Sequence, residues 1–204
     1  MVHHRPISDI AFTDTVKQLQ ARNGSRDAYA KMEMGSGWSD RITPQLAAFI
    51  AQQNSFYLAT VNADGQPYIQ HRGGPRGFLK PIDDRTLGMA DFRGNRQFIS
   101  QGNLIENRKA FIFLMDYANR RRIKIWGEAW MVEGDDALLQ AVMPDGYAAA
   151  LERVLLFKVS AWDPNCPQHI PRKVDLDEVE AMMAARDAEI VQLKARIVEL
   201  ETGT

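Results

Sequence analysis

The chain has 204 residues, of which 45% are hydrophobic and 25% are charged. That is enough for one globular domain of about 100–200 residues with an appendage, and it excludes both a disordered chain and a small disulfide-built protein. Because 25 Lys and Arg face 26 Asp and Glu, the formal charge is -1. The chain as a whole is therefore not attracted to nucleic acid or to an anionic membrane surface.

The apolar runs are short. The most apolar ones, such as Ala110–Met115 and Val154–Ser160, fall well below the roughly 20 residues that cross a bilayer. The N-terminus lacks an apolar signal core, and Cys166, the single cysteine, cannot form an internal disulfide. We therefore expect a cytoplasmic protein that has no membrane partner.

The first 40 residues read as an N-terminal arm. They are polar and interrupted by glycines, and they show one amphipathic pattern, over Thr13–Arg22. A second helix should follow, because Thr43 is a suitable N-cap and Pro44 suits a first helical turn. Its apolar spacing ends at about Gln53.

From residue 55 the pattern changes to short β-prone runs separated by turn residues. Strands are expected at Ser55–Val61, Pro67–His71, Gly77–Lys80, Thr86–Ala90, Ala110–Tyr117, Arg121–Val132 and Arg153–Trp162, with helices only from about Asn95 to Asn107 and near Asp135–Val142. Parallel strand pairs need long helical crossovers, so many strands with few helices favour a small antiparallel barrel.

After Pro171 the chain has a heptad pattern. Apolar residues recur with alternating spacings of three and four, and one charged residue, Arg186, occupies a seam position; the apolar members are Leu176, Val179, Met183, Ile190, Leu193, Ile197 and Leu200. This pattern is typical of a helix that pairs with another helix. The alternative is an amphipathic helix lying on its own barrel.

No familiar catalytic motif is present. The histidines, His3, His4, His71 and His169, are scattered, and the motifs of zinc proteases, serine hydrolases, dithiol enzymes and P-loop proteins are missing. We assign no catalytic residue and expect no metal. Cys166 is either a nucleophile or, as is more common for an isolated cysteine, a small buried side chain.

Basic residues are more informative, because they gather in three places. On the strand beginning at Arg121, alternation puts Arg122, Lys124 and Trp126 on one face and Arg121, Ile123 and Ile125 on the other. The run Arg93–Gln97 spans the start of the helix expected from about Asn95. Free backbone amides at the start of a helix bind phosphate. The glycine-rich run His71–Lys80 carries Arg72, Arg76 and Lys80.

These runs resemble a known family. The resemblance extends from about Thr43 to Arg172 and is most specific in Gln70–Leu79, Asp91–Gln97, Phe113–Tyr117, Asn119–Gly127 and Ala161–Ile170. Together they resemble the pyridoxamine 5'-phosphate oxidase-related, FMN-binding split-barrel proteins, in a flavin-nucleotide-binding subgroup. The resemblance implies a mainly β (α+β) fold, a six-stranded antiparallel split barrel with flanking helices, and a homodimer with FMN at its interface. The domains would be the arm 1–40, the barrel 41–172 and a C-terminal heptad helix 173–204.

The resemblance also implies roles for individual residues. Arg72, Phe78 and Leu79 would line the flavin ring, and Asn95, Arg96 and Gln97 would form the phosphate turn, with a hydroxyl added by Ser100. Arg122 and Lys124 would reach the flavin, often that of the other subunit. Trp162, His169 and Arg172 would close the site.

The function implied is that of an FMN-dependent oxidoreductase acting on an unidentified small molecule or electron donor by hydride transfer at flavin N5. The alternative is a non-catalytic flavin carrier or sensor that engages a partner through the C-terminal helix. Use of deazaflavin or haem stays open, while nucleic-acid binding through Arg120–Lys124 is disfavoured by the overall charge. The pyridoxamine phosphate oxidases proper end on a short arginine-containing segment, so the heptad helix argues against vitamin B6 synthesis.

Overall fold

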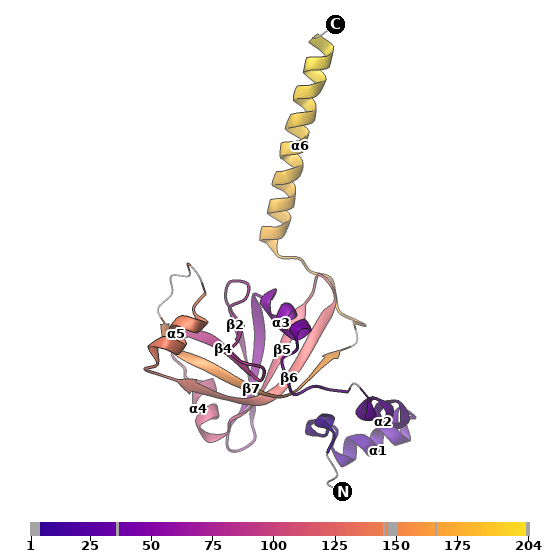
Figure 1. Cartoon of the computed structure of the whole chain (residues 1–204), viewed down its shortest axis with the longest axis vertical. Coiled ribbons are helices and arrows are strands. Elements are labelled where there is room, and N and C mark those ends of the chain that lie inside the picture. Colours follow the sequence, from indigo (N-terminus) through magenta and orange to yellow (C-terminus); the bar gives the residue numbers. More distant parts are fainter. Residues whose placement is uncertain (1–4, 36, 145, 147–150, 166, 203–204) are drawn as a thin grey trace.

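The computed structural model describes residues 5–35, 37–144, 146, 151–165 and 167–202. His3, His4 and Cys166 lie outside this range, and so do the roles suggested for them. Figure 1 shows three parts: a central barrel, a small helical lobe formed by the N-terminal segment, and a long C-terminal helix that projects away from the barrel.

The barrel is a single antiparallel sheet. Its strands are β1 (Ser55–Val61), β2 (Pro67–Gly73), β3 (Lys80–Pro81), β4 (Thr86–Phe92), β5 (Lys109–Asp116), β6 (Arg121–Val132) and β7 (Leu151–Asn165), and their order is β2-β1-β5-β6-β7-β4-β3. This confirms the antiparallel barrel. The sheet has seven strands rather than six because the two-residue β3 is added at one edge.

The two ends of the strand order come together in space. Arg72 of β2 forms an ion pair with Asp91 of β4, although these strands lie far apart in the order of the sheet. Helix α4 (Ile99–Glu106) lies close to β1 and β2, where Asn103 donates a hydrogen bond to Thr60 of β1 at 3.0 Å. The barrel therefore closes through side chains instead of a continuous backbone ladder.

Alternating side chains fill the barrel. Along β5 and the first half of β6 every second residue is buried, which places Ile112, Ile123 and Ile125 inside. Phe56 of β1 stacks on Phe78 at a centroid distance of 5.6 Å, and both rings are almost fully buried. This period-two pattern confirms the faces predicted for the strand that begins at Arg121.

The N-terminal lobe contains more helix than expected. A short 3-10 helix, η1 (Ile7–Ile10), precedes α1 (Asp14–Arg22) and α2 (Arg26–Met34). Only α1 was predicted; α2 has no buried residues and is flanked by glycines. A series of aromatic contacts, from Phe12 to Trp38 and from Trp38 to Trp126 of β6, joins the lobe to the barrel.

Two further helices match their sequence signals. In α3 (Pro44–Ala51) the Thr43 hydroxyl accepts a hydrogen bond from the Leu46 amide, as an N-cap does. In α5 (Asp136–Val142) Asp135 caps the Leu138 amide in the same way.

Two local predictions were wrong. The run Gly77–Lys80 is not a strand, because Gly77 and Phe78 belong to a turn and pairing begins only at Lys80. The helix expected from Asn95 begins at Ile99, because Arg96 and Phe98 adopt left-handed backbone angles, with φ of 59° and 55°, that a right-handed helix cannot contain.

The C-terminal helix is α6 (Leu176–Thr202), and none of its residues is buried. The alternative that this helix lies along its own barrel is therefore wrong, and Figure 1 shows it extending into solvent. Among the described residues, no helix is both long and apolar enough to span a membrane.

One glycine tests the packing of the barrel. A Cβ on Gly127, at the irregularity where β6 pairs with β7, would lie 2.1 Å from the Lys158 carbonyl oxygen and 2.5 Å from the Phe157 ring. We expect Gly127→Ala to lower the free energy of unfolding in urea by about 3 kcal/mol, the upper range for overpacking. The matched control is Gly102→Ala in α4, where nothing lies within 4 Å, and it should stabilise by about 0.5–1 kcal/mol. Equal effects of the two changes would contradict this packing.

Candidate functional site

A small cavity of about 60 Å³ lies where the barrel closes. Strand β2, the ends of β4 and β6, the start of β7 and the loop leading into α4 enclose it. Its lining is Tyr68, Gln70, Arg72, Asp91, Phe92, Gly94, Asn95, Arg96, Gln97, Phe98, Ile99, Ser100, Gln101, Met131, Glu152 and Arg153. Three arginines thus face two carboxylates.

Asp91 holds two of these arginines. It forms an ion pair with Arg72, and its second oxygen lies 3.4 Å from the Nε of Arg153, its antiparallel neighbour on β7. All three side chains are largely buried, with Asp91 and Arg153 only 8% and 7% exposed. The Nε atoms of Arg72 and Arg153 are buried and have no hydrogen-bond partner among the described residues.

The outer rim holds further charges. Arg153 donates a hydrogen bond to Glu152 at 2.6 Å and a second one to Gln101, while Arg93 lies 3.3 Å from Glu152. The hydrogen bond from Arg153 lowers the pKa of Glu152 below its ordinary value, and nearby Arg96 and Arg93 add to this against the opposing effect of desolvation. Glu152 therefore stays ionised at neutral pH.

The loop before α4 leaves backbone donors uncapped. Phe98 occupies the N-cap position of α4, and it makes no side-chain capping hydrogen bond. The first amides of the helix are the kind of donors that bind an anion. Ser100 is held in this turn, because its hydroxyl donates to Gln70 of β2 at 2.7 Å.

The cavity brings together five of the residues singled out in the sequence: Arg72, Asn95, Arg96, Gln97 and Ser100. Sequence reasoning missed Asp91, Arg153 and Gln70. A signal existed for two of these, because Asp91 ends the buried run Leu87–Ala90 and Arg153 begins the buried run Val154–Leu155. Charged residues at such positions are rarely buried unless they are paired.

The structure separates the other members of the glycine-rich run. Phe78 and Leu79 are core residues that follow β2 outside any strand, and neither lines the cavity that contains Arg72. Lys80 donates to the carbonyls of Ala141 and Met143 near the end of α5. The three cations of this run therefore do not form one cluster, because Arg76 faces α6 instead.

Arg122 and Lys124 lie on the other half of β6. Lys124 forms an ion pair with Asp163 at 2.7 Å and sits over the stacked rings of Trp38 and Trp126. Arg122 lines a separate hollow of about 350 Å³ formed by residues 119–123, Pro164 and Pro167. Its Nε is buried and has no hydrogen-bond partner in the described part of the chain.

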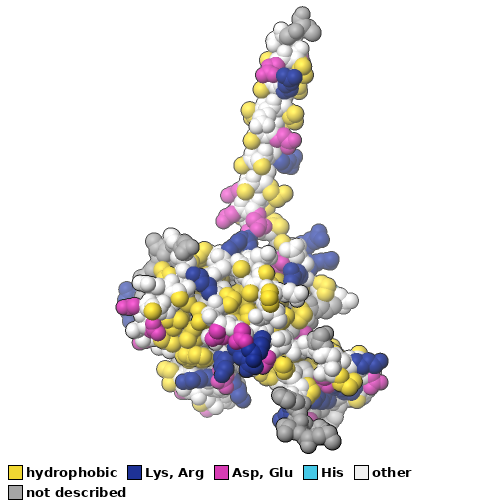
Figure 2. All heavy atoms as spheres, viewed as in Figure 1, with side chains coloured by type: hydrophobic (Ala, Val, Ile, Leu, Met, Phe, Trp, Pro, Cys, Tyr) yellow, Lys and Arg dark blue, Asp and Glu magenta, His cyan; other side chains and the backbone are white. Residues whose placement is uncertain are grey.

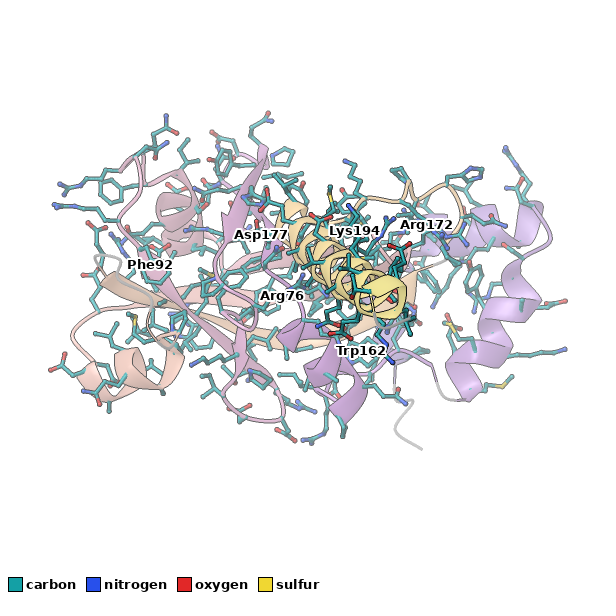
Figure 3. All side chains as sticks on the ribbon, turned by 90° about the horizontal axis from the view of Figure 1, so that it is seen from above. Arg76, Phe92, Trp162, Arg172, Asp177 and Lys194 are labelled. Atoms are coloured by element: carbon teal, nitrogen blue, oxygen red, sulfur yellow. The ribbon has the colours of Figure 1, made fainter. Side chains whose placement is uncertain are left out.

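The remaining predicted residues do not line the first cavity. Trp162 of β7 donates a hydrogen bond to the Arg41 carbonyl at 2.7 Å, and His169 and Arg172 lie exposed in the segment between β7 and α6. Figure 3 shows Trp162 well apart from Phe92, which lines the first cavity. Arg122 and Met131 are nine positions apart along β6, or about 30 Å of strand at 3.3 Å per residue.

Among the described residues, no three His, Cys, Asp or Glu side chains are grouped as metal ligands. The first cavity is instead suited to an anion. It offers guanidinium groups, uncapped amides and a polar turn, with its two carboxylates already engaged by arginines.

The role of Asp91 can be measured directly. Asp91→Asn removes the charge that holds two buried guanidinium groups, so we expect the free energy of unfolding to fall by about 3 kcal/mol. Urea denaturation of both proteins would measure the change. The control is Asp84→Asn, which breaks the exposed ion pair with Arg41 and should cost less than about 1 kcal/mol. If Asp91→Asn lowers the free energy of unfolding no more than Asp84→Asn does, the Asp91 ion pairs do not close the barrel.

Comparisons with known proteins identify the family. The chain is similar to HupZ of Group A Streptococcus, with 22% identity over 65% of this chain and 99% of that chain and a TM-score of 0.50. It is also similar to an FMN-binding protein from Syntrophomonas wolfei, with 17% identity over 72% and 97% and a TM-score of 0.47. The first of these likenesses supports the fold alone, and no curated protein matches. Residues 42–166, more than half of the chain, match the family described as pyridoxamine 5'-phosphate oxidase, and the protein belongs to that family.

Proposed function

We propose that the protein binds FMN and acts as an FMN-dependent oxidoreductase on a small molecule, with hydride transfer at flavin N5. The observation that carries this proposal is the cavity of Arg72, Arg96 and Arg153 at the uncapped start of α4, in a barrel of the pyridoxamine 5'-phosphate oxidase family. A phosphate is the chemical group that such a set of donors fits best.

The donors at the cavity fit a phosphate monoester. The buried Nε of Arg72 has no hydrogen-bond partner among the described residues, and an acceptor there would remove the cost of leaving it unpaired. Arg96 lies exposed beside the opening, with its guanidinium 5.7 Å from the Phe98 ring. Asn95, Gln97 and Ser100 would add polar contacts from the same turn.

A second copy would complete the site. Arg122 is separated by about 30 Å of strand from the residue of β6 that lines the cavity, so one copy does not bring both cationic regions to one small ligand. In a homodimer, Arg122 and Lys124 of one subunit would approach the flavin ring of the other. Trp162, His169 and Arg172 would lie beside them at that contact.

FMN, when bound, supplies a ring that accepts and returns a hydride, and the protein contributes binding, orientation and charge. Arg72, Arg96 and Arg153 would hold the phosphate, and Arg122 would place a positive charge that favours the reduced, anionic ring. We assign no acid or base, since hydride transfer depends on positioning more than on proton relay.

Purified protein tests the proposal. We expect a yellow protein with a flavin spectrum that bleaches under NADH or NADPH without oxygen and recolours in air. A colourless protein that FMN cannot reconstitute would contradict the proposal. Bound flavin that neither nicotinamide reduces would favour a carrier or sensor.

Arg96 is the cleanest probe of phosphate binding, because it is exposed and its loss should spare the fold. We expect Arg96→Ala to weaken FMN binding by about 1–3 kcal/mol through loss of a charge-assisted hydrogen bond, measured by fluorescence titration of the apoprotein. Arg93→Ala is the control, since Arg93 lies in the same loop but does not line the cavity. If Arg93→Ala has the larger effect, the phosphate is not bound as proposed.

Arg122 should act on the ring. We expect Arg122→Ala to lower the flavin reduction potential, because its charge favours the anionic reduced form over the neutral oxidised ring, with a smaller effect on binding. Reductive titration against a dye of known potential measures the shift. Arg121→Ala is the control, because Arg121 borders the same hollow but directs its guanidinium to the opposite face of β6, 5.0 Å from the Phe49 ring. A shift with Arg121→Ala alone would refute the assignment.

A further inference from the structure

We propose that α6 pairs with α6 of a second copy of this chain, as a parallel, in-register, two-stranded coiled coil. The proposal is independent of flavin binding. It rests on the unpartnered seam of α6, on the residue types along that seam, and on the charges beside it.

The seam of α6 is apolar and exposed. The helix spans 27 residues, or about 40 Å at 1.5 Å per residue, and the side of α6 visible in Figure 2 carries apolar side chains along its length. Ile190, Leu193, Ile197 and Leu200 are 43–61% exposed. A row of large apolar side chains of this length is typical of an interaction surface.

The residue types favour two parallel strands. With Leu176 at heptad position a, the a positions hold Leu176, Met183, Ile190 and Ile197, and the d positions hold Val179, Arg186, Leu193 and Leu200. In the C-terminal half, β-branched Ile therefore occupies a while Leu occupies d. That combination favours parallel dimers over trimers and tetramers.

The flanking charges favour the same arrangement. In a parallel pair, position g of one helix faces position e of the next heptad on the other. Glu189 would then face Lys194 of the second copy, and Arg196 would face Glu201 of the second copy. Arg196 is now 2.8 Å from Glu199 on its own helix, but both are about two-thirds exposed, so exchanging that pair costs little.

An antiparallel pair in full overlap would be less favourable. Position g would then face g, and e would face e, which brings Glu189 against Glu189 and Asp187 against Asp187 at the centre. Like charges at such positions are destabilising. The charge pattern therefore selects orientation as well as partner.

The base of α6 contacts the barrel through exposed ion pairs and a hydrogen bond. Arg76 lies 3.0 Å from Asp175 and also pairs with Glu178, and Asn54 donates to Asp175 at 2.8 Å. Figure 3 shows Arg76 beneath the helix. Asp175 would be the g residue facing Glu180 of the second copy, so Arg76 offsets the one repulsive pair of the parallel arrangement.

Arg186 sets the register. In the in-register pair, Arg186 of one helix faces Arg186 of the second copy at position d. Asp187 of the second copy lies at the adjacent e position. A charged residue in the seam lowers stability but disfavours shifted alignments, which would bury it against apolar side chains.

Cysteine cross-linking of the full chain tests the pairing. In a Cys166→Ser background we expect Leu193→Cys to give a disulfide-linked dimer as the main species under mild oxidation. Val191→Cys, two residues away and off the seam, should give only a trace. If the Leu193→Cys protein stays uncrosslinked, the parallel pairing is wrong. The pairing is also wrong if, in a mixture of the two variants, Leu193→Cys chains link only to Met183→Cys chains.

Exchanging the charges of Glu189 and Lys194 supplies a second test. Sedimentation measures the fraction of dimer, and mild oxidation measures the yield of the Leu193→Cys dimer. Glu189→Lys should reduce the yield several-fold by facing Lys194, and adding Lys194→Glu should restore it, while Glu199→Lys, off the seam, should leave it unchanged. No loss with Glu189→Lys, as the antiparallel pair predicts, overturns the proposal. A protein that still cross-links but that FMN cannot reconstitute would refute flavin binding alone.

Discussion

The ion pairs of Asp91 with Arg72 and Arg153 are the constraint on which the barrel and its cavity both depend. They join β2 to β4 where no backbone ladder does, and they put two guanidinium groups in a place with little water. Burying charges is expensive unless every donor is satisfied, yet the Nε of Arg72 stays unpaired among the described residues. This unpaired donor supports the proposal that the cavity binds an anion.

Strand β6 contributes residues to both cationic regions. β6 carries Met131 to the cavity at one end and Arg122 to a separate hollow at the other, so the two cationic regions line different hollows of one chain. The N-terminal lobe packs on the second region through Trp38 and Trp126. We propose that a homodimer brings the two regions together, and the proposed pairing of α6 would hold the two barrels near each other.

The sequence predicted most of the strands because each has its own local signal. β6 begins and ends at the predicted residues, since side chains alternate regularly along most of it and the turn residues Glu133 and Gly134 follow it. The start of α4 was mispredicted because Arg96 and Phe98 adopt left-handed backbone angles. Neither residue is a glycine or an asparagine, the types whose presence would predict such angles. Asp91 and Arg153 escaped notice because their pairing depends on the register of β4 with β7, which no local pattern contains. Phe78 and Leu79 resemble a family position, and the structure places their side chains in the barrel core.

The most direct test of the account compares FMN with riboflavin, which has the same ring without the phosphate, in binding to the apoprotein. If the arginine cavity holds the phosphate, FMN binds far more tightly than riboflavin, and Arg96→Ala narrows that difference by weakening FMN alone. Equal affinities for the two flavins, or a loss shared equally by both in the variant, would contradict the account.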